Sequence, residues 1–371
     1  MIHKLNLALL TGNLRENLTG IGTYTFQFAD KLPINRDCIT FIKHKSGDYL
    51  KGCNYYDVPY PLNRFSYLLW SNSVSLCKKK ISKFEIVHNV AQYPISPSIN
   101  ENYIVTIHDL IPVLYPDYVT KFFAIQARLY MPILLKKSKR IIAVSNSTKN
   151  DIIRRYSISP EKIDVIYEGV SNHFKVYAKS YVSNFRRHYG LGRPFILFVG
   201  ALEPKKNIET LIKAYYRAIK VIPDLDLVIA GKKAWKYKSI FNVVNQLNLQ
   251  KKVKFLNFIP YDELPLLYNA AELFVFPSLY EGFGLPPIEA MRCGVPVIVS
   301  NRSSLPEIVG NNGVIVDPLN FDQLSREIIK VLTDHELNRR LRLESIERSS
   351  LFTWENCSKA TLSSYEKAMD T

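Results

Sequence analysis

The sequence lacks any apolar run of about 18 residues, the length that a helix needs to cross a membrane. Its amino-terminal apolar run, Leu5–Leu10, is too short for a signal peptide and leads directly into a Thr-Gly-Asn turn. We therefore expect no transmembrane segment and a cytoplasmic location.

Cysteine is scarce and is not arranged in pairs. The five cysteines are odd in number and no Cys-x-x-Cys pair occurs, so neither a disulfide framework nor a zinc site is indicated. Internal repeats and low-complexity tracts are absent as well. This usage suits a reducing compartment, and the cysteines are Cys38, Cys53, Cys77, Cys293 and Cys357.

Negative charge is in short supply, above all in the first half of the chain. The formal net charge is +16, and residues 1–188 hold 26 Lys and Arg against 13 Asp and Glu. A field of this kind attracts a polyanion, either nucleic acid or an anionic lipid surface, although solvated faces of a generally basic protein explain it equally well. Because no nucleic-acid-binding motif is present, we expect no nucleic acid partner.

Two stretches combine aromatic and basic residues in the way that suits a peripheral contact with an anionic membrane. The first is Phe65–Trp70, with Phe65, Tyr67, Leu68, Leu69 and Trp70, followed by Lys78–Lys80. The second is Phe122–Leu135, followed by Lys136, Lys137, Lys139 and Arg140. For the second stretch, an ordinary core helix with a basic end is the favoured interpretation.

Short apolar runs typical of buried strands alternate with amphipathic stretches along the whole chain, and strands separated by helices pair in parallel. In the first half we expect strands at Leu5–Leu10, Ile39–Ile42, Ile86–His88, Tyr103–His108, Arg140–Val144 and Lys162–Tyr167. In the second half we expect them at Phe195–Gly200, Leu225–Ala230, Val253–Ile259, Leu273–Phe276, Val295–Ser300 and Val314–Val316.

The length and this pattern predict two α/β domains. A chain of 371 residues exceeds the usual size of one hydrophobic core, and 47% hydrophobic with 22% charged residues is typical of a globular protein. The apolar periodicity weakens around Tyr177–Gly192 and then resumes. We therefore expect a domain over residues 1–190 and a second over 191–353, each with its own doubly wound sheet.

The strongest motif is the segment from Pro277 to Ala290, which follows an expected strand. Open α/β sheets bind ligands at this strand edge. Gly282 and Gly284 allow the backbone to approach a ligand, and the amides at the start of the next helix suit an anion. Two carboxylates, Glu281 and Glu289, bracket the segment. Ionised carboxylates accept hydrogen bonds, so they suit hydroxyl groups of a sugar and a ribose.

The eight-residue spacing of Glu281 and Glu289, with Gly-Phe-Gly-Leu-Pro between them, resembles the family 4 retaining glycosyltransferases. The resemblance implies the GT-B fold, with two Rossmann-like domains facing across a cleft. It implies that Glu281 is a catalytic residue that contacts the donor sugar near the reacting centre and that Glu289 holds the ribose. The intervening backbone would bind the phosphates of a nucleotide-diphosphate sugar, through Gly282, Phe283, Gly284 and Leu285, and Ser278 just before Glu281 is a further donor-binding candidate. The last helix, about 354–371, resembles the segment that crosses back to the first domain.

A second motif follows the strand Phe195–Gly200, where Lys205 and Lys206 precede a helix that Asn207 could cap. Cations here would neutralise a diphosphate together with helix amides. In the family a basic pair at this place holds the diphosphate, so the resemblance assigns Gly200 and Lys205 to donor binding and Lys206 to both donor binding and catalysis. Many members carry Arg where this chain has Ala201 and Lys205.

Further residues take candidate roles through the resemblance. Gly20 and Gly22 stand between the first strand and helix and would face the donor phosphates. His108, in the string His-Asp-Leu-Ile-Pro, matches a histidine that contacts the donor sugar, so the resemblance makes it a catalytic candidate. Similar strings occur in a subgroup rich in mannosyltransferases. Asp109 and Ser145 are candidates on the acceptor side.

The function expected is transfer of a hexosyl group, with mannose from GDP-mannose favoured, onto a glycan or lipid-linked acceptor. We expect no metal or other cofactor, because the Asp224-Leu225-Asp226 string precedes its strand rather than following it. Two alternatives remain: a nucleotide-sugar epimerase of the same fold, and a non-catalytic protein that binds nucleotide-sugars or polyanions.

Overall fold

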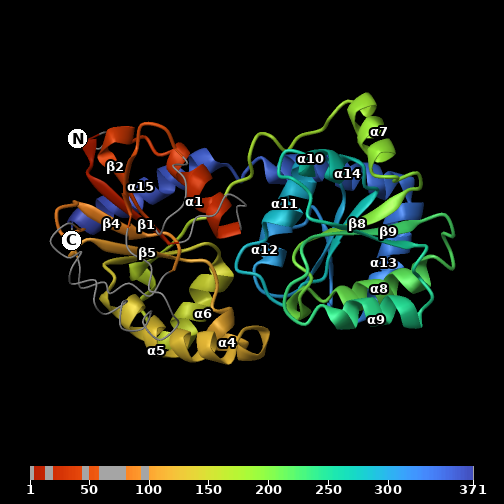
Figure 1. The fold of residues 1–371 in the computed structure, drawn as a ribbon, viewed down its shortest axis with the longest axis horizontal. Helices are drawn as coiled ribbons and strands as arrows, with labels where there is room; N and C mark the ends of the chain where they lie inside the picture. Colours follow the sequence, from red (N-terminus) through yellow and green to blue (C-terminus); the bar gives the residue numbers. More distant parts are fainter. Residues whose placement is uncertain (1–3, 13–19, 44–49, 58–80, 93–99, 371) are drawn as a thin grey trace. The chain divides into compact units, whose positions relative to one another are not determined.

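The computed structural model describes residues 4–12, 20–43, 50–57, 81–92 and 100–370. The chain divides into two compact units (Figure 1). The first comprises Met1–Gly169 and Thr353–Thr371, and the second comprises Val170–Phe352. The basic and aromatic stretch Phe65–Trp70 with Lys78–Lys80 lies outside the described residues.

The first unit is built on a parallel sheet of seven strands in the order β3-β2-β1-β4-β5-β6-β7. Strands β4 and β5 are buried along their whole length, including the polar residues His88, Asn89 and Thr106. The strands are β1 (Leu7–Gly12), β2 (Ile39–Lys43), β3 (Asn54–Asp57), β4 (Ile86–Asn89), β5 (Tyr103–Ile107), β6 (Arg140–Ala143) and β7 (Ile163–Val165).

Helices pack on this sheet (Figure 1). The helix α15 packs against α1, where the Ser358 hydroxyl donates to the Phe28 carbonyl at 2.9 Å. The helices are α1 (Gly20–Asp30), α4 (Ile111–Leu114), α5 (Lys121–Lys137), α6 (Asn146–Tyr156) and α15 (Trp354–Asp370), with the 3-10 turns η2 (Arg36–Cys38), η4 (Pro116–Tyr118) and η5 (Pro160–Lys162).

The second unit holds a parallel sheet of six strands in the order β10-β9-β8-β11-β12-β13. The strands are β8 (Phe195–Val199), β9 (Asp226–Ala230), β10 (Val253–Asn257), β11 (Leu273–Phe276), β12 (Val297–Ser300) and β13 (Val314–Val316). Around them lie α7 (Lys179–His188), η6 (Pro204–Lys206), α8 (Ile208–Ala218), α9 (Lys238–Gln246), α10 (Leu264–Asn269), α11 (Leu285–Arg292), α12 (Leu305–Val309), α13 (Phe321–Thr333) and α14 (His335–Ser349).

In each sheet, the strand that comes first in the sequence lies inside the sheet, and the later strands are added first on one side of it and then on the other. In the first unit this switch point lies between β1 and β4, and in the second it lies between β8 and β11. Loops that leave neighbouring strands at a switch point diverge to opposite faces, so ligands of doubly wound sheets bind there. The α/β class expected from the sequence is confirmed, with both sheets parallel.

The division between the units lies between Gly169 and Val170, about 20 residues before the boundary that the weakened periodicity suggested. The segment after Val170 belongs to the second unit because Phe174 packs against Tyr268 there, with ring centroids 5.9 Å apart. Helix α7 was not recognised in the sequence, since Phe185 is its one buried residue and the other positions are largely polar or exposed.

Candidate active site

Two loops leave the carboxyl ends of β8 and β11 and meet at the switch point of the second unit. The Leu279 amide donates to the Lys205 carbonyl at 2.8 Å, which ties the loop after β11 to η6. Beside this bond, Lys206 Nζ lies 2.6 Å from Glu281 Oε1. The two motifs singled out in the sequence, 75 residues apart, therefore form one local structure.

The pair of Lys206 and Glu281 is largely withdrawn from water, since their side chains are 11% and 12% exposed. Lys206 Nζ also lies 4.9 Å from the centre of the Phe276 ring, a cation–π contact. Burial alone would raise the pKa of Glu281, but the charges of Lys206 and Lys205 outweigh it and leave that pKa below its ordinary value. The ionised form of Glu281 is therefore favoured where it lies.

Lys205 and Asn207 flank this pair. Lys205 Nζ lies 3.4 Å from Glu203, so its charge is partly matched within its own loop. Asn207 stands directly before α8, as expected, but its side chain does not cap the helix. Its amide instead donates to the Pro277 carbonyl at 3.2 Å and the Pro318 carbonyl at 2.6 Å. Asn207 thereby holds the start of the loop after β11 in place.

Hydrogen bonds of serine side chains and one buried aromatic contact hold the rest of that loop in place. The Glu281 amide donates to Ser303 Oγ at 2.8 Å, and the Ser304 hydroxyl donates to the carbonyls of Glu281 and Phe283. Ser278 is fully buried, and its carbonyl accepts from Ser300. The Phe283 ring is buried against Phe352. These two predicted donor-binding residues therefore present backbone rather than side chain to any ligand.

Gly284 ends the loop and begins α11. Its φ of +125° lies in the region that favours glycine, so the turn into the helix requires this residue. Pro286 and Pro287 follow in the first helical turn and have no N–H group. The amide donors at this helix start are therefore supplied at positions up to Leu285 and not beyond it.

Glu289 lies within α11 and is 9% exposed. The Tyr268 hydroxyl donates to its Oε2 at 2.7 Å. Burial raises the pKa of Glu289 to about 7, and the Tyr268 hydrogen bond opposes that shift only in part. Further hydrogen-bond donors, such as a vicinal pair of hydroxyl groups, would stabilise the ionised form of this buried carboxyl group.

Gly200 follows β8 with φ at +157°, and its backbone runs tightly against the next loop. The Gly200 amide donates to the Ala230 carbonyl at 2.9 Å. A Cβ atom on the neighbouring Gly231 would lie 1.9 Å from the Gly200 carbonyl oxygen. Gly231 was not singled out in the sequence, although a glycine directly after a buried strand is a general sign of close backbone approach.

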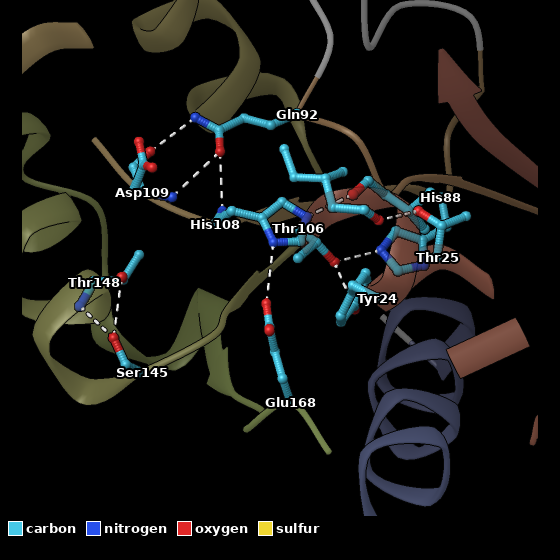
Figure 2. A network of polar contacts seen from close by, with 12 residues as sticks. Tyr24, Thr25, His88, Gln92, Thr106, His108, Asp109, Ser145, Thr148 and Glu168 are labelled. Carbon is cyan, nitrogen blue, oxygen red and sulfur yellow. Dashed lines mark hydrogen bonds and ion pairs between the residues drawn. The ribbon is translucent and has the colours of Figure 1, made fainter. Parts of the chain in front are cut away.

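His108 lies at the carboxyl end of β5 in the first unit, and Figure 2 shows it at the centre of a polar network. Its Nε2 is 2.8 Å from the Val90 carbonyl oxygen and its Nδ1 is 3.3 Å from Glu168 Oε1. A carbonyl only accepts, so Nε2 carries hydrogen. A single proton then lies between Nδ1 and the buried Glu168 carboxyl group, which the sequence analysis had not identified.

Gln92 joins this network to the neighbouring residue (Figure 2). Its side-chain oxygen accepts from the His108 amide at 2.9 Å, and its side-chain nitrogen donates to the Asp109 carbonyl at 2.9 Å. The Asp109 carboxylate accepts from the Ile111 amide at 3.0 Å, at the start of α4. The predicted acceptor-side role of Asp109 therefore concerns a side chain that already stabilises a turn.

A second histidine, His88, lies deeper in the same unit. Its two ring nitrogens bond the hydroxyl groups of Tyr365 at 2.7 Å and Thr106 at 2.8 Å, and Thr106 also bonds Tyr24 at 3.2 Å (Figure 2). Burial lowers the pKa of His88 to about 3, and His108 adds to the effect. His88 is a neutral structural residue that anchors α15 to the sheet.

The remaining predicted residues of the first unit lie at helix starts. Ser145 is fully buried and caps α6, where its Oγ accepts from the Thr148 amide at 3.0 Å. Ser147 lies inside the helix and is not its cap. Gly20 and Gly22 belong to the first turn of α1 rather than to a loop, and a Cβ atom on Gly20 would meet nothing within 4 Å. The fold thus has no steric need for glycine at position 20.

Comparison with known proteins shows which family the chain belongs to. The family described as Glycosyltransferase Family 4 matches residues 18–173, and the family described as Glycosyl transferases group 1 matches residues 184–348. The O-antigen chain mannosyltransferase RfbU of Salmonella typhimurium is 31% identical over 81% of this chain and 83% of its own length. The chain belongs to the family 4 glycosyltransferases.

A second relative of this glycosyltransferase is also a named mannosyltransferase, and a solved structure has the same fold. The O-antigen chain mannosyltransferase B of Escherichia coli is 28% identical over 72% of this chain and 70% of its own length. Among solved structures, Anabaena HepE, crystallised with UDP and glucose, superposes with a TM-score of 0.81 at 19% identity, over 98% of this chain and 99% of that one. The predicted GT-B fold is therefore confirmed.

A cavity of the glycosyltransferase lies away from the switch point. Its volume is about 620 Å³, it lies at the amino ends of β11 and β12, and its lining includes Arg186, Asn269, Glu272, Gly294 and Arg342. Its guanidinium groups already bond backbone carbonyls of the same unit. Over the described part of the chain, no group of three His, Cys, Asp or Glu side chains is arranged to hold a metal ion.

Asp226, from the Asp-Leu-Asp string, is the first residue of β9. Its carboxylate lies 3.3 Å from Lys254 Nζ and 3.8 Å from the Arg193 guanidinium. It therefore lies at the amino edge of the sheet, opposite the switch-point loops.

Proposed function

We propose that this enzyme transfers a mannosyl group from a nucleotide-diphosphate sugar, GDP-mannose being favoured, to a glycan or lipid-linked acceptor with retention of anomeric configuration. The observation that carries the proposal is the contact of Lys206 with Glu281 beside the Gly282–Leu285 backbone, at the switch point of the second sheet. The named activities of RfbU and of E. coli mannosyltransferase B support mannose and a polysaccharide product.

The diphosphate would bind through Lys206 and the backbone amides around Gly284. Its oxygens compete with Glu281 for Lys206 Nζ, so donor binding replaces one partner of the lysine by another. Lys205 would add charge, since its carbonyl bond to Leu279 already holds it beside the loop. Ala201 supplies no cation, so Lys205 and Lys206 would be the basic pair that holds the diphosphate.

The two carboxylates would bind hydroxyl groups. Glu281, relieved of part of its ion pair, accepts from the donor sugar, while Glu289 accepts from the ribose. The buried position of Glu289 makes it a strong acceptor once ionised, because few water molecules compete for it.

The chemical step follows from this arrangement. The bond between the anomeric carbon and the β-phosphate oxygen breaks, and the departing diphosphate takes the bonding electron pair, stabilised by Lys206 and the amides. The acceptor hydroxyl oxygen forms a bond to the anomeric carbon on the face that the diphosphate leaves, and the hydroxyl proton passes to the departing phosphate oxygen. The configuration is therefore retained without the paired carboxylates of glycosidases.

A donor screen followed by a transfer assay tests the proposal. We expect GDP-mannose to raise the melting temperature more than other nucleotide-sugars, because a ligand that binds the folded state stabilises it by mass action. Product should form only with an acceptor present, and its anomeric configuration should match the donor. Conversion of the donor without any acceptor would instead identify an epimerase, and inverted product would exclude the mechanism.

A further inference from the structure

One hydroxyl group of the protein holds the carboxyl group of Glu289 from one side. Tyr268 lies in α10, which packs against α11 (Figure 1), and its hydroxyl donates to Glu289 Oε2 at 2.7 Å. The other oxygen, Oε1, has no hydrogen-bond partner within the described part of the chain. One oxygen of this carboxyl group is therefore held by the protein, and the other is left for a ligand.

The packing of the Tyr268 ring fixes the direction of this hydrogen bond. The ring is fully buried and lies edge-on to two others, with centroid distances of 5.9 Å to Phe174 and 5.5 Å to Phe274. A ring enclosed in this way cannot swing its hydroxyl to another acceptor without displacing its aromatic neighbours. The Tyr268 hydroxyl is therefore a fixed donor, and the carboxyl group that accepts from it keeps one orientation.

The surroundings of Glu289 offer no cation to stabilise its charge. Burial raises its pKa to about 7 and the Tyr268 bond opposes that shift, while no charged residue of α12, α14 or any other described element contributes. Tyr261, before α10, and Cys293, after α11, also sense its charge, but burial raises the pKa of each and keeps both neutral. The pKa of Tyr268 is likewise raised by burial and by Glu289, so its hydroxyl remains a donor.

We propose that Tyr268 is a positioning residue for donor binding, which holds Glu289 so that its Oε1 is presented to the two ribose hydroxyl groups of the nucleotide-sugar. The inference rests on the ribose role that the proposed function gives to Glu289. Burial favours the protonated carboxyl group, which is a poorer acceptor, and the bond from Tyr268 favours the anion. Tyr268 therefore strengthens donor binding through Glu289 rather than through a contact of its own.

The variant Tyr268→Phe tests this role, because it keeps the buried ring and removes only the hydroxyl group. We expect it to bind a nucleotide-sugar roughly tenfold more weakly than the wild type at pH 7, since a hydrogen bond to a charged group is lost. The matched control is Tyr215→Phe, in α8 of the same unit. Tyr215 is also fully buried, and its hydroxyl donates to the Leu225 carbonyl at 2.8 Å, so this variant should bind like the wild type.

Calorimetric titrations between pH 6 and pH 8.5 separate positioning from a structural role. The probes are GDP-mannose and UDP-glucose, which both carry the ribose. Wild-type affinity should fall as the pH drops through about 7, where Glu289 becomes protonated. In Tyr268→Phe the fall should begin about one pH unit higher or more, so the deficit seen at pH 7 shrinks severalfold by pH 8.5. A deficit that is equal at every pH overturns the inference.

A double-mutant cycle shows whether Tyr268 acts through Glu289. The variant Tyr268→Phe/Glu289→Gln should bind no more weakly than Glu289→Gln alone, and melting curves show that each variant is folded. Additive losses overturn the inference and leave the proposed function standing, as does normal binding by Tyr268→Phe beside weakened binding by Glu289→Gln. Normal binding by Glu289→Gln, or no wild-type binding to either nucleotide-sugar, overturns the proposed function and the inference together.

Discussion

The two sheets have the same strand order around their switch points, but they place different chemistry at the carboxyl ends of the strands. In the second unit an ion pair, Lys206 and Glu281, lies beside glycine backbone and a helix start. In the first unit two histidines lie there, and each ring nitrogen already has a partner within the unit. In the second unit the side chains pair through opposite charges, which a bound anion would compete for under the proposed function, whereas in the first unit hydrogen bonds fix both histidine rings.

The difference teaches that a Rossmann-like topology supplies the place for a ligand, while the residues after the strands decide what happens there. An ion pair held by one short contact can be opened by a competing phosphate. A histidine fixed on both nitrogens keeps one orientation, which suits positioning. The four predictions below test this contrast, beginning with the largest expected effect.

Replacing Lys206 with Met should reduce transfer by about 10² to 10³-fold, because the cation proposed to face the leaving diphosphate is lost while an unbranched side chain of similar length remains. The measurement is the turnover rate at saturating donor. Lys213→Met, on the exposed face of α8, is the control and should retain full activity. Near-normal turnover in Lys206→Met would remove the distinction drawn between the two edges.

Replacing Glu289 with Gln should stabilise the fold at high pH. The folded-state pKa of Glu289 is raised from 4.5 to about 7, so over this interval the folded protein holds a proton that the unfolded chain has released. The wild type therefore loses stability as the pH rises through the interval, and the variant does not. The gain should be near zero at pH 4 and on the order of 3 kcal/mol at pH 8.

Urea unfolding at the two pH values measures this gain, with Glu209→Gln as a control. The same Gln variant should bind the nucleotide more weakly, since an amide is a poorer acceptor than a carboxylate. A gain that does not change with pH would show that the pKa of Glu289 is the same in the folded and unfolded protein.

Replacing Glu168 with Gln should change the protonation of His108 and cost about 1–2 kcal/mol of stability. With Nε2–H bound to the Val90 carbonyl, Nδ1 would accept from the new amide, so the ring becomes a fixed neutral tautomer. Nitrogen NMR shifts of the imidazole report this directly, and Glu101→Gln serves as the control. Unchanged shifts would mean that Glu168 does not share the proton.

Replacing Ser145 with Ala should cost about 1 kcal/mol through loss of the α6 cap. Thermal unfolding measures the cost, and Ser147→Ala, inside the same helix, should change stability by less than about 0.5 kcal/mol. We expect the Michaelis constant for the acceptor to stay the same, because the Ser145 side chain is fully buried. A changed constant would restore the acceptor-side role given to it from the sequence.

The two motifs of the candidate site could be recognised in the sequence because their signals are local. The glycines and carboxylates between Glu281 and Glu289 follow one strand, and the lysine pair follows another, so each is visible in a short window of sequence. Buried strands such as Leu273–Phe276 were placed to the residue, since an apolar run bounded by turns leaves little choice.

Glu168, Asn207 and Tyr268 were not assigned their actual roles, because each depends on a partner that is distant in the sequence. Glu168 meets His108 across 60 residues, Asn207 meets the Pro318 carbonyl across 111, and Tyr268 meets Glu289 across a strand and a turn. Asn207 even looked like a helix cap, since its position alone fits that role. A charged residue placed between a buried strand and Gly169 was the one local hint of Glu168.

The sequence by itself determined most of the strands and which side chains carry charge, but it did not predict β3, α7 or the need for glycine at position 231. Only the tertiary structure decided that Lys206 and Glu281 are partners and that Ser145 faces the core. The physical reason is that local propensity depends on neighbours along the chain. Burial and pairing depend instead on the strand order, which brings residues far apart in sequence to the same edge of a sheet.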